Sequence, residues 1–175
     1  AKKVLILSSS PRRGGNSDTL CDEFMRGAVE SGNHVEKIFL RDKTIHLVLD
    51  AASVACIKNR VTKDDAAEVI GKMLEADVIV MATPVYFYAM SAQMKILIDL
   101  AAVLYRNEKQ RFYFIATAAE EDETIMKRVV DISVVSSIVL RICNKRNSIR
   151  WRSLDVGEIK DKPVLTEAYE MGKKV

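Results

Sequence analysis

The sequence has few of the residues that build metal sites and disulfide frameworks. It holds three cysteines, Cys21, Cys56 and Cys143, which lie far apart and never form a Cys-x-x-Cys pair. Its two histidines, His34 and His46, are isolated and lack the spacing of metal ligands. We therefore expect no metal site, no disulfide framework and a reducing, cytoplasmic compartment.

The sequence also lacks long apolar runs, repeats and blocks of like charge. The apolar run that follows Lys3 is too short for a membrane span or for the core of a signal peptide. The net charge is +3 and the lysines and arginines are scattered, which suits a small anionic ligand better than nucleic acid. Residues 141–152 form a basic stretch around Trp151, for which a loop or a dimer contact is favoured over a nucleic-acid patch. We accordingly expect no membrane partner and no nucleic-acid partner.

What the sequence does contain is a regular succession of short apolar segments and amphipathic stretches. The chain has 175 residues, which suits a single domain over residues 1–175 with a substantial core. Apolar and β-branched segments predict strands at residues 4–7, 34–40, 78–82, 112–116 and 134–142. Apolar residues at helical spacing predict helices from about residues 17, 62, 91 and 122, and a last helix that opens at Pro163.

Polar residues and glycines predict where these helices begin and end. Ser17 or Asp18 is expected to cap the first helix, and Gly32 to end it. Thr62 and Asp65 resemble a capping box at the start of the second helix.

Strands that alternate with helices predict an α/β fold, in which helices cover both faces of a parallel sheet and the crossovers are right-handed. Ligands of such sheets bind beyond the carboxyl ends of the strands, where the strand order switches. Three predicted loops lie at those ends, at residues 8–17, 83–90 and 117–121. We expect them to converge on one site.

The first of these loops has the composition of an anion-binding turn. Gly14 and Gly15 allow a tight backbone turn, and Arg12 offers a guanidinium fork to phosphate oxygens. The loop region also supplies short polar side chains, namely Ser8, Ser10, Asn16, Ser17 and Thr19. It matches neither the P-loop nor the Gly-x-Gly-x-x-Gly fingerprint. Its position between a buried strand and a helix N-terminus favours phosphate binding over a plain strand–helix turn.

The second and third loops are less specific. Tyr86, Phe87 and Tyr88 suit a flat heteroaromatic ring, or else they cover the core or a subunit interface. A lone small domain would expose much of the apolar surface of these residues and Met90, which favours a ligand groove or an interface. In the third loop, residues 117–119 could offer N–H groups to a ring carbonyl, whereas the acidic residues 120–123 better fit the first turn of a helix.

The combined motifs resemble those of the NADPH-dependent FMN reductase and iron–sulfur flavoprotein group of the flavodoxin-like superfamily. The first motif of that group stands here as Ser-Ser-Pro-Arg-Arg-Gly-Gly-Asn-Ser at residues 9–17, and the second as Thr-Pro-Val-Tyr at residues 83–86. Residues 90–95, 157–160 and 168–172 also look like this group, so the resemblance covers nearly the whole chain. It implies a flavodoxin-like three-layer sandwich with a five-stranded parallel sheet in the order 2-1-3-4-5.

The same resemblance implies an NAD(P)H-dependent, FMN-containing oxidoreductase that passes electrons to a flavin, a quinone or another small acceptor. FMN would be the cofactor and NADPH or NADH the co-substrate, and no side chain is required as a catalytic acid or base. The implied phosphate ligands are Ser10, Arg12, Asn16 and Ser17. The implied ring contacts are Pro84, Val85, Tyr86 and Phe87, with Thr117 and Ala118 near the other edge. The family also implies a homodimer or homotetramer with the flavin near the subunit interface.

The sequence departs from the family pattern at three places. Ser9 replaces the usual glycine of the first motif, which would tighten the turn. Cys56 is alone where iron–sulfur members carry a compact cysteine cluster, so a cluster that needs about four ligands does not fit there. The third loop reads Ala-Ala-Glu-Glu at residues 118–121 where relatives are often rich in glycine, which would crowd the ring or repel its reduced form. Two other functions therefore stay open: an electron-carrier flavodoxin, a class that tends to be acidic, and an interaction module that has lost FMN.

Overall fold

The predicted alternation of strands and helices is present in the computed structural model, which describes residues 1–47, 64–101, 110–119, 148–152 and 157–175. Its parallel strands are β1 (Lys3–Ser8), β2 (His34–Phe39), β3 (Val78–Tyr86), β5 (Arg111–Ala118) and β6 (Ser148–Arg152). Its helices are α1 (Asn16–Glu30), α3 (Ala66–Glu75), α4 (Ala92–Leu100) and α6 (Pro163–Lys173), with a short 3-10 helix, η1 (Leu40–Asp42).

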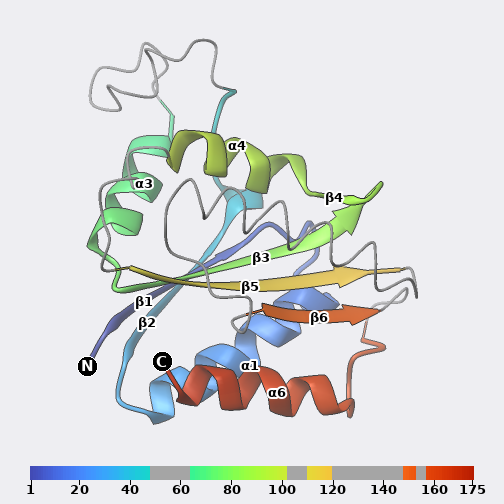
Figure 1. The fold of residues 1–175 in the computed structure, drawn as a ribbon. Helices are drawn as coiled ribbons and strands as arrows, with labels where there is room; N and C mark the ends of the chain where they lie inside the picture. The colour runs from blue at the N-terminus through green and yellow to red at the C-terminus, as the bar shows by residue number, and fades with distance from the viewer. Residues whose placement is uncertain (48–63, 102–109, 120–147, 153–156) are drawn as a thin grey trace.

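The sheet has the strand order β2-β1-β3-β5-β6, and each of these neighbouring pairs is parallel (Figure 1). Numbered along the chain, the parallel strands have the order 2-1-3-4-5, so this prediction is confirmed. β2 lies on one side of β1 and β3 lies on the other, so the strand order switches between β1 and β3. The carboxyl ends of these two strands border the switch point, where such sheets bind ligands. A two-residue strand, β4 (Ala89–Met90), lies off this order and pairs antiparallel with β3.

The fifth parallel strand lies later in the chain than predicted. Residues 134–142, predicted to form it, lie outside the described residues, as does the helix predicted from residue 122. The observed strand β6 falls within the basic stretch for which the sequence favours a loop or a dimer contact, so the predicted loop is wrong for residues 148–152. The segment alternates Ile149 and Trp151 with polar residues, the period of a strand, but neighbouring charges obscure the pattern.

In the described part of the chain two helices cover each face of the sheet, because successive strand residues point to opposite faces and both sets are apolar. Leu5, Leu7 and Ile79 pack with α3 and α4, which lie above the sheet in Figure 1. Val4 and Ile6 pack with α1 and α6 below it. None of the helices in the described part of the chain is long and apolar enough to cross a membrane.

Helix α1 begins earlier than the sequence predicts. Gly15 is its N-cap, so Ser17 and Asp18 lie in the first turn and neither of them caps the helix. Gly32 lies just beyond the other end with a φ of +81°, the left-handed conformation in which glycine ends helices. The predicted C-terminal end is thus confirmed and the predicted cap is wrong.

The other helix boundaries are partly as predicted. Asp65 is the N-cap of α3 instead of its third residue, and its side chain makes no capping hydrogen bond but accepts from Thr44 N. Thr62 lies outside the described residues. The predicted capping box is therefore wrong at Asp65. Ser91 caps the next helix by accepting from the backbone of its first turn, and Pro163 opens α6 as predicted.

Helices α1 and α6 approach each other closely at two glycines. A Cβ on Gly27 would lie 2.1 Å from the carbonyl oxygen of Tyr169, and one on Gly172 would lie 2.1 Å from that of Phe24. Such distances are far below van der Waals contact, and the obstructing atoms belong to backbone that cannot rotate away. The two glycines therefore set the distance between these helices.

We expect Gly27→Ala to lower the free energy of unfolding by about 1–3 kcal/mol or more, because the methyl group forces the two helices apart. Gly71→Ala is the matched control, because a Cβ on this helical glycine would have nothing within 4 Å. There alanine should raise stability by about 0.5–1 kcal/mol through its better helix propensity. Urea unfolding followed by circular dichroism measures both, and equal effects of the two substitutions would contradict the close packing.

Candidate functional site

The three predicted loops lie together at the carboxyl ends of β1, β3 and β5, where they line a hollow of about 250 Å³. The predicted site residues that line it are Ser10, Arg12, Asn16, Ser17, Pro84, Val85, Tyr86, Thr117 and Ala118. Pro11 and Gly15 also line it, as does Ala119, which belongs to the segment expected to offer N–H groups to a ring carbonyl. Ser8, Thr19 and Phe87 do not line it.

The first loop folds tightly on itself between β1 and α1. The Ser10 hydroxyl donates to Arg12 O at 2.9 Å, and Arg12 N donates to Ser10 Oγ at 3.3 Å. Gly15 N donates to the same carbonyl at 3.3 Å. A Cβ on Gly15 would lie 3.2 Å from Arg12 O and 3.3 Å from Ser10 Oγ, so a larger residue would push the turn open. Ser10 therefore shapes the loop, because its hydroxyl already donates and accepts within it.

Two buried serines end β1 below this loop. Ser9 N and Ser9 Oγ both donate to Ala82 O, at 2.9 and 3.1 Å, so the serine that replaces the family glycine ties β1 to β3. Ser8 is fully buried, and its hydroxyl has no hydrogen-bond partner among the described residues. An unsatisfied buried hydroxyl is uncommon and often marks a place that a ligand or water completes.

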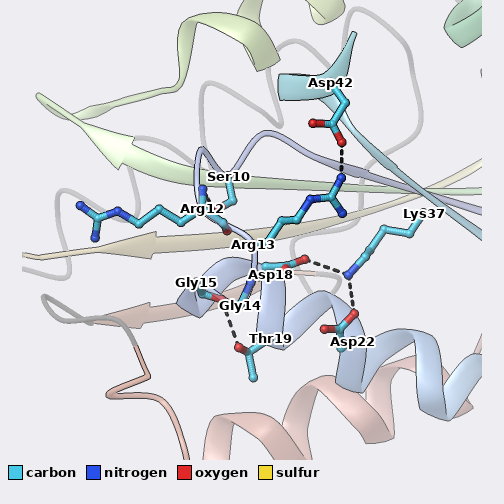
Figure 2. Close-up of polar contacts among 10 residues, drawn as sticks. All are labelled: Ser10, Arg12, Arg13, Gly14, Gly15, Asp18, Thr19, Asp22, Lys37 and Asp42. Atoms are coloured by element: carbon cyan, nitrogen blue, oxygen red, sulfur yellow. Dashed lines mark hydrogen bonds and ion pairs between the residues drawn. The ribbon is translucent and has the colours of Figure 1, made fainter.

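The groups that face the hollow from the first loop suit an anion. The first turn of an α-helix leaves N–H groups without intrahelical partners and carries a partial positive charge. In α1 that turn borders the hollow through Asn16 and Ser17. Arg12 is exposed and its guanidinium pairs with none of the described residues. In Figure 2 it extends away from Arg13, which pairs with Asp42.

Three polar side chains in this region make contacts that hold α1 in place. Thr117 donates to Ser17 Oγ at 3.3 Å, which joins β5 to the helix and leaves the Ser17 proton to donate. Asn16 Oδ1 accepts from Gly157 N at 3.1 Å and so connects the helix to the segment before α6. Thr19 Oγ1 donates to Gly15 O at 3.1 Å, within the first turn of the helix and outside the hollow (Figure 2).

Strand β3 continues through the second loop instead of ending before it. Residues 83–86, predicted to break the strand, extend it, and Val85 and Tyr86 pair with β4 in a short hairpin. The Thr83 hydroxyl donates to Pro84 O and accepts from Ser91 N, each at 2.9 Å, which fixes the start of α4. Pro84 and Val85 are half-buried where they line the hollow.

The turn of this hairpin is aromatic and strained. Phe87 and Tyr88 have φ values of 45° and 64°, the conformation of a type I′ turn, in which Asn-Gly is preferred. The left-handed region costs a non-glycine residue about 1–2 kcal/mol. Phe87 is 98% exposed, while Tyr86 and Tyr88 are 49% and 53% exposed. Met90 is buried among core residues, so it does not belong to the exposed cluster that the sequence predicts.

The third loop begins directly beside the second. Thr117 and Ala118 are buried at the end of β5, and Ala119 is exposed. Ala116 and Ala118 pack with Val85, so the second and third loops contact each other. Glu120 and Glu121, which the sequence analysis relates to flavin binding, lie outside the described residues.

A buried ion pair lies at the first turn of α1. Lys37 Nζ donates to Asp18 Oδ1 at 2.8 Å and also pairs with Asp22 (Figure 2). Burial alone would lower the pKa of Lys37, but its hydrogen bonds to Asp18 and Asp22 outweigh that effect and raise the pKa, so the lysine stays charged. Burial raises the pKa of the Cys21 thiol far above its usual range and keeps it protonated. Across the described ranges, no group of metal-ligating side chains comes together.

Comparison with known sequences places these features in a family. The model of the NADPH-dependent FMN reductase family matches residues 2–126. An iron–sulfur flavoprotein of Methanocaldococcus jannaschii is 37% identical over 105 residues, which cover 55% of this chain and 50% of the relative. A Bacillus subtilis protein named for an NAD(P)H-dependent FMN-containing oxidoreductase is 29% identical over 97 residues, which cover 55% of this chain and 50% of that protein. The chain thus spans about half the length of these curated relatives.

Solved structures share the fold at low sequence identity. An azoreductase from Bacillus anthracis superimposes with a TM-score of 0.77 at 15% identity, and the alignment covers 100% of both chains. This likeness confirms the flavodoxin-like architecture that the motifs imply. The family match covers about 70% of the sequence and contains all three loops that line the hollow. The chain belongs to the NADPH-dependent FMN reductase family.

Proposed function

We propose that this chain binds FMN in the hollow and acts as an NAD(P)H-dependent oxidoreductase that reduces a small acceptor. The observation that carries this proposal is the meeting of three loops at one hollow, with anion-type donors on one side and apolar and aromatic side chains on another. FMN has a phosphate at one end and a flat ring at the other, so it requires a site with two such ends. FMN and NADPH are also the cofactor and co-substrate of the family.

The phosphate would lie at the first loop. The exposed guanidinium of Arg12, the available proton of Ser17 and the first-turn N–H groups of α1 are the donors that a phosphate requires. This set of donors therefore fits the group that the family binds.

The ring would lie between the second and third loops. Pro84, Val85 and Tyr86 offer apolar and aromatic surface to one side of it, and Thr117 and Ala118 lie at the facing strand end. When bound, FMN would supply the redox chemistry, namely electron transfer between NAD(P)H and the acceptor. The residues of the chain bind and orient it, and none of them has to move a proton.

The direct test is the visible spectrum of the purified chain after incubation with FMN and removal of unbound flavin. We expect about one FMN per chain, and oxidation of NADPH or NADH when a free flavin or a quinone is added. A chain that holds FMN without oxidising either nucleotide would be an electron carrier. A chain that holds no FMN would be an interaction module, and either result would contradict the proposal.

We expect Arg12→Ala to weaken FMN binding by roughly tenfold or more, because a charge-assisted hydrogen bond contributes about 1.5–3 kcal/mol. Arg26→Ala is the matched control, because this exposed arginine of α1 pairs with Glu23 and Glu30 and does not line the hollow. A flavin fluorescence titration measures both variants. Unchanged affinity in Arg12→Ala would remove Arg12 from the site.

We further propose that the chain forms a homodimer or homotetramer through the hairpin turn beside the hollow. Phe87, Tyr86 and Tyr88 expose apolar surface there, and exposed apolar patches mark interfaces or ligand grooves. Phe87 does not line the hollow, so the groove accounts for only part of the patch. The turn has strained aromatic residues where Asn-Gly would be more stable. The choice of residues therefore indicates a role for this turn other than stabilising the single chain.

Light scattering at micromolar concentration should give a mass of two or four chains. The Phe87→Asn/Tyr88→Gly variant removes the aromatic contacts and suits the turn better, so it should keep its fold and give the mass of one chain. Leu74→Ser is the control, because this exposed apolar residue lies on α3 and away from the turn. A wild-type protein with the mass of one chain would end this proposal.

We expect the chain to hold no iron–sulfur cluster, although some curated relatives are iron–sulfur flavoproteins. A cluster needs about four ligands, mostly cysteine thiolates, and the sequence has three cysteines. Cys21 is fully buried and its thiol stays protonated. Iron and acid-labile sulfide in anaerobically prepared protein should therefore lie far below one cluster per chain, and an amount near one would contradict this expectation.

A further inference from the structure

The negative charge of Asp18 is unfavourable in an anion-binding turn, because it would repel a bound anion. Asp18 lies in the first turn of α1, and only 5% of its side chain is exposed. Both carboxylate oxygens are engaged, because Oδ2 accepts from Gly14 N at 2.7 Å and Oδ1 accepts from Lys37 Nζ at 2.8 Å. A buried carboxylate is tolerated when it is paired and hydrogen-bonded in this way. Asp18 thus connects the first loop to β2.

The hydrogen bond to Gly14 fixes the conformation of the loop. Gly14 has a φ of +68°, the left-handed region that glycine adopts at no steric cost. In a capping box, an acidic side chain at the third helical position returns to the N–H of the N-cap. Asp18 reaches one residue further, to the residue before the N-cap Gly15. The turn that follows Arg12 therefore keeps one shape, and Arg12 keeps its place at the hollow.

Lys37 lowers the electrostatic cost of this arrangement. An unpaired carboxylate in the first turn of α1 would repel a phosphate bound at the same helix end. Lys37 is 14% exposed and bonds both Asp18 and Asp22, and its ammonium lies 4.9 Å from the centre of the Phe39 ring. It is the only cation that contacts Asp18 among the described residues.

A second set of contacts holds the outer side of the same loop. The Arg13 guanidinium pairs with Asp42 of η1 and lies 4.2 Å from the centre of the Phe39 ring. Arg41, also of η1, donates to Pro11 O. Figure 2 shows Arg13 and Asp42 on one side of the loop and the Arg12 side chain on the other. Contacts with β2 and η1 thus engage one arginine and leave the other for a ligand.

We propose that Asp18 is a positioning residue for phosphate binding, which acts through the Gly14 N–H and whose charge Lys37 offsets. Asp18 does not touch the ligand. It sets the loop conformation in which Arg12 and the first turn of α1 do so. The proposal rests on the proposed FMN function, because it concerns the phosphate end of the same hollow.

The test compares FMN with riboflavin, which has the same ring and no phosphate, by flavin fluorescence titration. Asp18→Ala and Asp18→Asn remove the same charge, but only alanine removes the acceptor for Gly14 N–H. We expect FMN to bind the alanine variant about tenfold more weakly than the asparagine variant, as for the loss of one buried hydrogen bond. Riboflavin should bind both variants as it binds the wild type, because the loop acts on the phosphate alone.

A second pair of variants tests the role of Lys37. Lys37→Met leaves the Asp18 charge without its cation, and we expect FMN affinity to fall about tenfold, more at low salt than at high salt. Adding Asp18→Asn to Lys37→Met removes that charge, so the double variant should recover most of the affinity. This pair keeps an acceptor for Gly14 N–H and decides the question of charge even if Asp18→Ala does not fold.

Equal FMN affinities of the alanine and asparagine variants would overturn the positioning role. So would a loss of riboflavin binding that matches the loss of FMN binding, because that result indicates general damage. A double variant no better than Lys37→Met would overturn the charge-offsetting role. A wild-type chain that binds no FMN would instead remove the proposed function, and this proposal with it, so the two failures are distinguishable.

Discussion

The turn between β1 and α1 has to satisfy its own backbone and still leave donors for a ligand. Ser10, Arg12 and Gly15 hydrogen-bond to one another within the turn, and Asp18 holds Gly14 from the helix. These bonds use the inward-facing groups of the loop. The guanidinium of Arg12 and the first-turn N–H groups then stand on a frame that the protein's own hydrogen bonds hold, which would lower the entropic cost of the proposed FMN binding.

The position of the loop between β1 and α1 depends on the placement of α1. The helix lies against α6, at a distance set by Gly27 and Gly172. Its first turn contacts the end of β5 through Thr117 and the segment before α6 through Gly157. Both Gly157 and α6 lie beyond residue 126, where the family match ends. The C-terminal part of the chain therefore supports a site whose described lining residues come from the matched part.

Much of this arrangement could be predicted from the sequence, and the remainder could not for identifiable reasons. The apolar strands β1, β3 and β5 and the polar loops that follow them carry strong local signals, so the convergence of the loops was predictable. The N-cap Gly15 gives no side-chain signal, and the charges around β6 obscure its alternation. The contact between Asp18 and Lys37 joins residues 19 positions apart, which no local pattern reveals. Phe87 and Tyr88 are atypical of a type I′ turn, so composition does not predict one there.

The most direct measurement of the central claim is a crystal structure of the chain grown with FMN. The account predicts that the phosphate lies at the first turn of α1 within hydrogen-bond distance of Arg12. It also predicts that the ring lies between Tyr86, at the end of β3, and the end of β5. FMN that is well ordered elsewhere on the molecule would contradict the account. So would FMN in the hollow with its phosphate directed away from the first loop.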